Sequence, residues 1–277
     1  MNWNEKKIRI AVLDMNEGHF NQGMRCIREI INTWSSHNYM DATLDEFEVR
    51  IKEEFPDTSY DIYISSGGPG SPLESEGSNW EKKYFNWLRS IEQWNCQTEL
   101  IPKHIFFICH SFQLVCRHYK VGNVCKRKST SFGVFPVHKL ENAHDEIIFK
   151  GLNEPFYAVD SRDYQVIEPN YNQLRKMGAT ILAIEKDRPH VPLERAIMAI
   201  RFNEYFIGTQ FHPEADAIGM SMYLQRADKK EIIIATHGEA KWQNMLEHLS
   251  DPDKILWTYN CILPNFLNNA IAVSAFA

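Results

Sequence analysis

The sequence lacks several patterns, and each absence argues against a class of protein. It has no basic excess, since 36 acidic residues outnumber 30 lysines and arginines, which argues against a nucleic-acid-binding protein. Its six cysteines include no CxxC pair, so neither a zinc knuckle nor a disulfide framework is expected. The first residues are polar, and no apolar run reaches the roughly 18 residues of a membrane span. We therefore expect no signal peptide, no membrane contact and a cytoplasmic protein with reduced thiols.

The composition fits a folded protein with a substantial core. Hydrophobic residues make up 44% of the 277-residue chain and charged residues 24%. A chain of this length can form one large α/β domain or two small ones.

Apolar strand patterns alternate with helical patterns along the first part of the chain. The expected strands are 8–13, 47–51, 61–65 and 104–108, and the expected helices are 21–34, 80–91 and the segment that follows residue 109 and ends near Tyr119. This alternation predicts an α/β fold with a doubly wound, mostly parallel central sheet flanked by helices. In such sheets, sites form beyond the carboxyl ends of the strands.

The later part of the chain changes character twice. Further strands are expected at 132–137, 156–159 and 180–184, with a hairpin of 196–202 and 206–210 around Asn203–Glu204. The basic run 126–128 is expected in a solvated loop. Helices are expected at 220–226, 239–249 and 262–270, and Asp251-Pro252-Asp253 fits a helix start. We therefore predict a domain of residues 1–219 and a helical C-terminal extension, 220–277, packed on the same domain.

Cys109 occupies the junction between a predicted buried strand and a predicted helix. A sharp turn at such a junction lifts one side chain above the sheet edge, as in a nucleophile elbow. The dipole of the following helix favours a thiolate near its N-terminus. The plainer interpretation is a buried cysteine that acts as a small hydrophobic residue.

Two other stretches stand at strand ends. Ser66-Gly67-Gly68-Pro69 follows a predicted strand, and its amide groups can form an anion-binding concavity, although an isolated stretch of this kind is more typical of an ordinary turn. No Gly-Lys-Ser/Thr follows, which argues against a phosphate loop. His212 and Glu214 stand two residues apart just past another strand, so their side chains share a face. They too fit a simple surface turn when taken alone.

The order of these stretches resembles the class I glutamine amidotransferase family. Its pattern is SGGP, then GxCxGxQ, then a strand ending in QFHPE. This sequence has Ser66–Pro69, then Cys109 with Gln113 four residues later, then Gln210 to Glu214. The resemblance covers residues 8–216. It implies a flavodoxin-like fold and a cysteine amidohydrolase that releases ammonia from the side-chain amide of glutamine.

The resemblance also implies roles for individual residues. Cys109, His212 and Glu214 would form a catalytic triad that passes through a γ-glutamyl thioester. The backbone amides of Gly68 and His110 would stabilise the oxyanion. Gln113 would hold the substrate or a loop, and neither a metal nor an organic cofactor would be needed.

The sequence departs from the family pattern at several points. Phe107 and Ser111 stand where the family has elbow glycines, so bulkier side chains there could alter or occlude the turn. Ser161-Arg162 replaces a Ser-His pair, which puts substrate contacts there in doubt. No SGGVDS-type motif of a synthetase is present, so ammonia would pass to a separate partner enzyme.

Two other functions fit the same residues. A γ-glutamyl peptide or other small-amide hydrolase would use the same triad, with Arg162 or the run 126–128 meeting a substrate carboxylate. A non-catalytic binding or regulatory subunit would have a degraded elbow. Because the elbow glycines are missing, we also expect slow glutamine hydrolysis by the isolated chain, with Cys109 alkylated faster than the other five cysteines. The sequence leaves the acceptor, the partner and the oligomeric state open.

Overall fold

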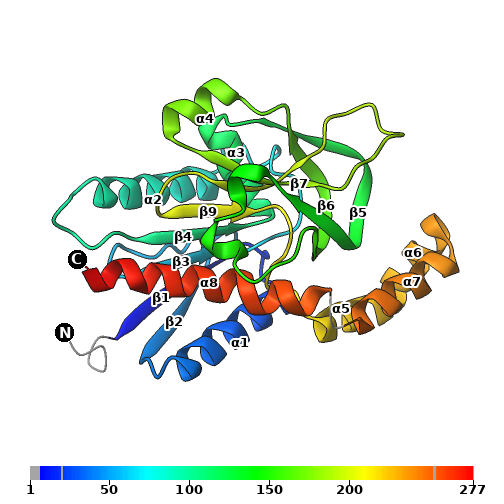
Figure 1. Ribbon diagram of the computed structural model, residues 1–277, viewed down its shortest axis with the longest axis horizontal. Coiled ribbons are helices and arrows are strands. Elements are labelled where there is room, and N and C mark those ends of the chain that lie inside the picture. Colours follow the sequence, from blue (N-terminus) through cyan, green and yellow to red (C-terminus); the bar gives the residue numbers. More distant parts are fainter. Residues whose placement is uncertain (1–6, 20, 252–253, 277) are drawn as a thin grey trace.

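The computed structural model describes residues 7–19, 21–251 and 254–276. One nine-stranded sheet runs through the molecule, and helices cover both of its faces (Figure 1). The predicted α/β class with a helix-flanked sheet is therefore confirmed.

The sheet is mixed. Its strands are β1 (Ile8–Asp14), β2 (Ala42–Glu48), β3 (Ile62–Ser65), β4 (His104–Ile108), β5 (Asn123–Lys139), β6 (Phe156–Ile167), β7 (Thr180–Glu185), β8 (Ile197–Arg201) and β9 (Phe206–Thr209). Their spatial order is β2-β1-β3-β4-β9-β8-β7-β5-β6. The pairs from β2 to β9 are parallel and those from β9 to β6 are antiparallel. The expected parallel arrangement thus holds for one half, whereas the short β8–β9 connection forces an antiparallel pair.

Helices form a layer on each face of the sheet. On one face lie α2 (Asn79–Asn95), α3 (His110–Tyr119) and α4 (Tyr171–Met177), and on the other lie α1 (Gln22–His37) and α8 (Ile255–Phe276) (Figure 1). Buried residues form a separate core cluster on each side. Side-chain caps fix the starts of two of these helices, because Asn21 accepts from the amide of Gly23 at 2.5 Å and Ser78 accepts from that of Glu81 at 3.4 Å.

Two local predictions are wrong. The second strand was expected at 47–51, but β2 spans Ala42–Glu48 and pairs with β1 from Ala42 opposite Ile8. This strand lies at the sheet edge and carries polar, partly exposed residues, so the apolar alternation that marks a strand is weak there. The basic run 126–128 lies within β5 and not in a solvated loop. The Arg127 side chain is only 5% exposed, because Glu185 pairs with it.

The C-terminal segment is almost entirely helical. It comprises α5 (Ala217–Gln225), α6 (Ala227–His237), α7 (Glu239–Ser250) and α8. The sequence did not predict α6, and α8 extends beyond the expected 262–270 on both sides. Part of the expected helix start, 252–253, lies outside the described residues. None of the helices in the described ranges combines the length and the apolar character needed to cross a membrane.

The C-terminal helices share the packing of the rest of the chain. Helix α8 places Ile262, Leu263, Phe266 and Leu267 in the core cluster on the α1 face of the sheet. Helices α5 and α7 pack on β5 and β6 through residues that include Leu224. The division at residue 219 remains a prediction.

Candidate functional site

Cys109 stands where β4 turns into α3. Its backbone has φ +49° and ψ −97°, a conformation that a residue with a side chain rarely adopts. Two hydrogen bonds hold it there. The amide of Cys109 donates to the carbonyl of Thr209 at 2.8 Å, and its carbonyl accepts from the amide of Gln113 at 3.0 Å. Cys109 therefore has the strained strand-to-helix geometry that the sequence predicts for an elbow.

His212 and Glu214 follow the strand next to β4. The His212 amide donates to the carbonyl of Val159 at 2.8 Å, which ties this segment to β6. Nδ1 of His212 lies 2.8 Å from Oε1 of Glu214. The His212 side chain is 19% exposed and the Glu214 side chain 3%. The extended segment around Pro213 thus presents both side chains on one face, as their spacing predicts.

Gly67 shows how closely Cys109 and His212 approach each other. A Cβ added to Gly67 would lie 2.8 Å from Cε1 of His212 and 3.5 Å from Cβ of Cys109. Both side chains therefore flank one point of the glycine loop. The Cys109 side chain also forms a hydrogen bond with the His212 imidazole.

The charge state of His212 depends on these neighbours. Burial lowers its pKa most, but Glu214 and then Cys109 raise it, and together they hold the pKa well above the usual range for histidine. The imidazolium form is thus stabilised beside the sulfur. A base that can accept and hold a proton next to a thiol is what nucleophilic cysteine chemistry requires.

The Glu214 carboxylate lies against the N-terminus of α1. A Cβ on Gly23, in the first turn of that helix, would be 3.1 Å from Oε1 of Glu214. The N-terminus of a helix favours a negative charge. Asp216, two residues further on, forms an ion pair with Arg25 at 2.7 Å, which fastens the same segment to α1. These contacts favour an ionised Glu214.

The two predicted oxyanion donors lie at the glycine loop and at the start of α3. Within the described residues, neither the amide of Gly68 nor that of His110 donates to a protein acceptor. A Cβ on Gly68 would lie 2.9 Å from that of Met15, so the loop can approach the end of β1 only with glycine there. Burial, with smaller effects of Arg50 and Arg117, lowers the pKa of the His110 imidazole to about 3. Its neutral ring is buried beneath the loop region, so the backbone amide is the group that His110 can offer.

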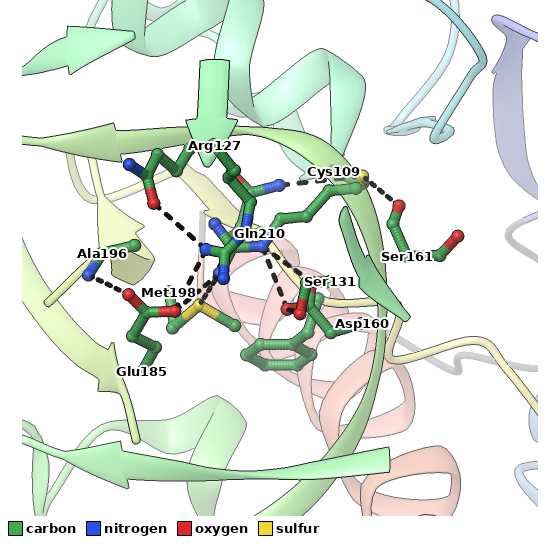
Figure 2. Close-up of polar contacts among 12 residues, drawn as sticks. Cys109, Arg127, Ser131, Asp160, Ser161, Glu185, Ala196, Met198 and Gln210 are labelled. Atoms are coloured by element: carbon green, nitrogen blue, oxygen red, sulfur yellow. Dashed lines mark hydrogen bonds and ion pairs between the residues drawn. The ribbon is translucent and has the colours of Figure 1, made fainter. Parts of the chain in front are cut away.

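Gln113 contacts the site through another glutamine. Its Nε2 donates to Oε1 of Gln210 at 3.0 Å and to the carbonyl of Tyr164 at 3.2 Å. Nε2 of Gln210 in turn lies 3.7 Å from Sγ of Cys109, a contact drawn in Figure 2. Gln113 therefore holds a loop and orients Gln210. Sequence reasoning had Gln210 within the QFHPE stretch but gave it no role.

Arg162 does not face a substrate. Its side chain is 1% exposed and binds Asp160 through Nε at 2.8 Å and Glu185 through Nη2 at 3.2 Å. Arg127 meets the same Glu185 carboxylate, and Figure 2 shows this charge cluster beside Cys109 and the Ser161 carbonyl. That carbonyl lies 3.8 Å from Sγ of Cys109. The predicted use of Arg162 or Arg127 as a binder of a substrate carboxylate is therefore wrong, because internal carboxylates already pair with both.

The two departures at the elbow are accommodated without occlusion. The ring of Phe107 packs 6.0 Å from that of Phe202, in the core cluster opposite to the one that contains Cys109. Gly208 stands directly opposite Phe107 in the register of β4 and β9, and a Cβ there would lie 2.9 Å from Phe112. A glycine on the neighbouring strand thus provides the room that the family pattern takes from the elbow itself. The expected occlusion by Phe107 is wrong.

The described residues contain no group of three or more His, Cys, Asp and Glu side chains that could hold a metal ion. The groups that gather at Cys109 are instead amides, carbonyls, one imidazole and one carboxylate. This set can take up and return a proton and can form a covalent bond through sulfur.

Comparison with known proteins places this geometry in a family. The family model of class-I glutamine amidotransferase matches residues 26–225. A glutamine amidotransferase from Thermotoga maritima has a similar fold, with a TM-score of 0.67 and 16% identity over 95% of this chain and 98% of that one. A glutamine amido transferase from Methylobacillus flagellatus gives a TM-score of 0.62 and 15% identity over 97% and 95%.

The fold is also similar to the glutaminase domain of CTPS from Trypanosoma brucei, solved with bound acivicin. The TM-score is 0.57, with 16% identity over 96% of this chain and 94% of that chain. A search of curated proteins finds no match. The family match covers most of the chain and spans both the glycine loop and the elbow cysteine. The chain therefore belongs to the class I glutamine amidotransferase family.

Proposed function

We propose that this protein is a glutamine amidotransferase-type cysteine hydrolase, which releases ammonia from the side-chain amide of glutamine. The observation that carries the proposal is the grouping of Cys109, His212 and Glu214 at one edge of the sheet. Cys109 stands on a strained elbow, and His212 lies 2.8 Å from Glu214. Membership of the class I family supports the same chemistry.

Each residue takes one role in the reaction. The sulfur of Cys109 attacks the amide carbon while His212 holds the thiol proton. His212 then protonates the leaving amine, and ammonia departs as the γ-glutamyl thioester forms. Water hydrolyses the thioester to glutamate and restores the thiol. Glu214 orients the imidazole and stabilises its cation, and the amides of Gly68 and His110 stabilise the oxyanion.

A separate partner enzyme would use the ammonia. The printed names of two similar structures point to such assemblies, one a subunit of a GMP synthase and one the glutaminase domain of CTPS. We expected slow glutamine hydrolysis without a partner because elbow side chains would displace the His110 amide. The packing of Phe107 and Ser111 removes that physical reason, and the steady-state rate of the isolated chain is the measurement that decides it.

The alternative is a γ-glutamyl peptide hydrolase with the same catalytic residues. Its main sequence support was a free arginine beside the site, and Arg162 is fully engaged by Asp160 and Glu185. Glutamine is therefore the substrate that we favour. The non-catalytic reading predicts that all six cysteines are alkylated at similar rates.

The test is a screen of glutamine and other γ-glutamyl amides for ammonia or amine release, with Cys109→Ala beside the wild type. We expect release that Cys109→Ala abolishes, and Glu214→Ala to retain more activity because it only orients the base. Cys116→Ala is the matched control, since Cys116 is a buried cysteine on the same helix and burial raises its pKa.

A glutamine-analogue electrophile gives a second readout. It is expected to label Cys109 and to leave Cys116 unmodified. Undiminished turnover in Cys109→Ala would place the activity at another site and overturn the proposal.

A further inference from the structure

A line of four buried groups joins the elbow to the glycine loop. The Ser111 hydroxyl donates to the carbonyl of Ser66 at 2.6 Å, and its oxygen lies 2.7 Å from the hydroxyl of Ser65. The Ser65 hydroxyl lies 3.0 Å from that of Tyr84. Ser65, Ser111 and Tyr84 are completely buried, and Ser66 is 3% exposed.

The donors and acceptors of this line have one consistent order. Ser111 donates to a carbonyl, so its oxygen accepts from Ser65, and the Ser65 oxygen accepts from Tyr84. Burial raises the pKa of Tyr84, which keeps its phenol protonated and available as the first donor. Chains of this kind strengthen their members, and a buried acceptor left unpaired costs about 1–3 kcal/mol. The Ser111–Ser66 bond is therefore well defined.

The bond joins the two places that would supply the oxyanion donors. Ser111 is the next residue after His110, and Ser66 stands two residues before Gly68. Other contacts fasten the rest of the loop. The Ser66 hydroxyl accepts from the amide of Met15 at 3.0 Å, and Arg50 donates to the carbonyl of Pro69 at 2.5 Å. A glycine at position 111 could not make the direct bond.

We propose that Ser111 is a positioning residue that holds the glycine loop, residues 66–69, against the elbow, so that the amides of Gly68 and His110 converge on one oxyanion. This inference rests on the proposed function. Ser111 does not touch the substrate and acts through the two amides. It thus turns a departure from the family pattern into a brace within this chain.

The experiment compares Ser111→Ala and Ser111→Gly with the wild type in two reactions of Cys109. The first is glutamine hydrolysis, which develops an oxyanion. The second is alkylation by iodoacetamide, in which sulfur displaces iodide and no oxyanion forms. We expect kcat for glutamine to fall about 10- to 100-fold with KM within about twofold, since loss of a whole donor costs roughly 10²–10³-fold. The alkylation rate should stay at the wild-type value.

A binding measurement isolates the oxyanion step. The aldehyde analogue of glutamine adds to Cys109 as its sulfur bonds to the carbonyl carbon. The thiol proton moves to His212, and the carbonyl oxygen becomes the oxyanion. Its affinity should fall by the same factor as kcat in Ser111→Ala. Ser90→Ala is the matched control, because it also removes a hydroxyl that donates to a backbone carbonyl, at 2.7 Å on α2. This control should match the wild type in every assay.

The outcomes separate this inference from the proposed function. An active wild type with an equally active Ser111→Ala overturns the positioning role alone, as does a variant whose alkylation falls together with kcat. A wild type that neither hydrolyses glutamine nor binds the aldehyde overturns both. If the Ser111 variants do not fold, Tyr84→Phe weakens the same line from its outer end. We expect a two- to threefold lower kcat at unchanged alkylation, and an unchanged kcat would count against the proposal.

Discussion

At the scale of single residues, His212 shows one carboxylate reversing the effect of burial. Burial alone would lower the pKa of this imidazole, as it does for His110. Glu214 and Cys109 outweigh it and raise the pKa well above the usual range. Because the folded pKa exceeds the unfolded one, this pairing stabilises the fold fully below about pH 6.5. The contribution is lost as the pH rises through the folded pKa.

Glu214→Gln should therefore move the His212 pKa in the opposite direction. Without the carboxylate, burial is the largest remaining effect, so we expect the pKa to fall from above about 6.5 to near or below it. The measurement is a pH titration of the imidazole carbon resonances by NMR. His110 serves as the internal control, because burial keeps its pKa at about 3 in both proteins. A His212 pKa that is unchanged by Glu214→Gln would show that the carboxylate does not set the charge of the base.

At the scale of elements, the contact between β4 and β9 decides how the elbow can carry Phe107. The two strands are parallel neighbours, with Phe107 opposite Gly208. Phe107 and Phe112 fill the space in front of this glycine, and an added Cβ would come within 3.1 Å of the Cβ of Phe107. Packing on one strand thus compensates for a bulky residue on the next.

Gly208→Ala should destabilise the fold by about 1–3 kcal/mol, because the added methyl group overpacks a closed core. Chemical denaturation measures this loss. In a Phe112→Leu background the ring edge, 2.9 Å from the added Cβ, is gone. We expect the penalty of Gly208→Ala to be at least about 0.5 kcal/mol smaller there, as a double-mutant cycle would record. Equal penalties in both backgrounds would place the strain elsewhere.

At the scale of the whole molecule, the C-terminal helices complete the fold. Helix α8 covers the face of the sheet that also carries α1, and its side chains lie in the same core cluster (Figure 1). Trp34 of α1 donates to the side chain of Asn268 at 2.8 Å. The segment 220–277 is therefore expected to be part of the folding unit.

A chain that ends at residue 219 should fail to fold. It would lose Ile262, Leu263, Phe266 and Leu267, each at most 2% exposed. Full burial of such side chains contributes about 1.5–3 kcal/mol each, and their sum is comparable to the whole stability of a domain. Circular dichroism and thermal unfolding of the truncated chain test this. A cooperative transition near the wild-type melting temperature would show that the first 219 residues fold independently.

Acid should destabilise the protein through a second buried histidine. Burial, with a smaller effect of Arg201, lowers the pKa of His104 to about 4. Between about pH 6.5 and 4 the unfolded chain takes up a proton that folded His104 does not, so stability falls as the pH falls. His104→Phe, which can keep the edge contact with Tyr205, should flatten this dependence by up to about 3 kcal/mol. Urea unfolding at several pH values measures it, and an unchanged slope would assign the acid sensitivity to other groups.

Local patterns were enough to predict most strands and helices and the three stretches at the site. Strand β4 is apolar throughout, and α3 repeats apolar residues at helical spacing, so the junction at Cys109 could be read from the sequence. The proximity of His212 and Glu214 follows from their spacing alone, because residues two apart share a face of extended chain. The edge strand β2 escaped prediction because its exposed polar residues carry no clear period.

What the tertiary structure decided depends on residues far apart in the chain. Ser111 meets Ser66 from 45 positions away, and Gln113 meets Gln210 from 97. No periodicity or spacing encodes such pairs, since they form only when β3, β4 and β9 lie side by side. The sequence therefore determined the fold class and the chemistry available at the site. The assembled sheet alone determined which carboxylates engage the arginines, where the elbow finds room, and what holds the glycine loop.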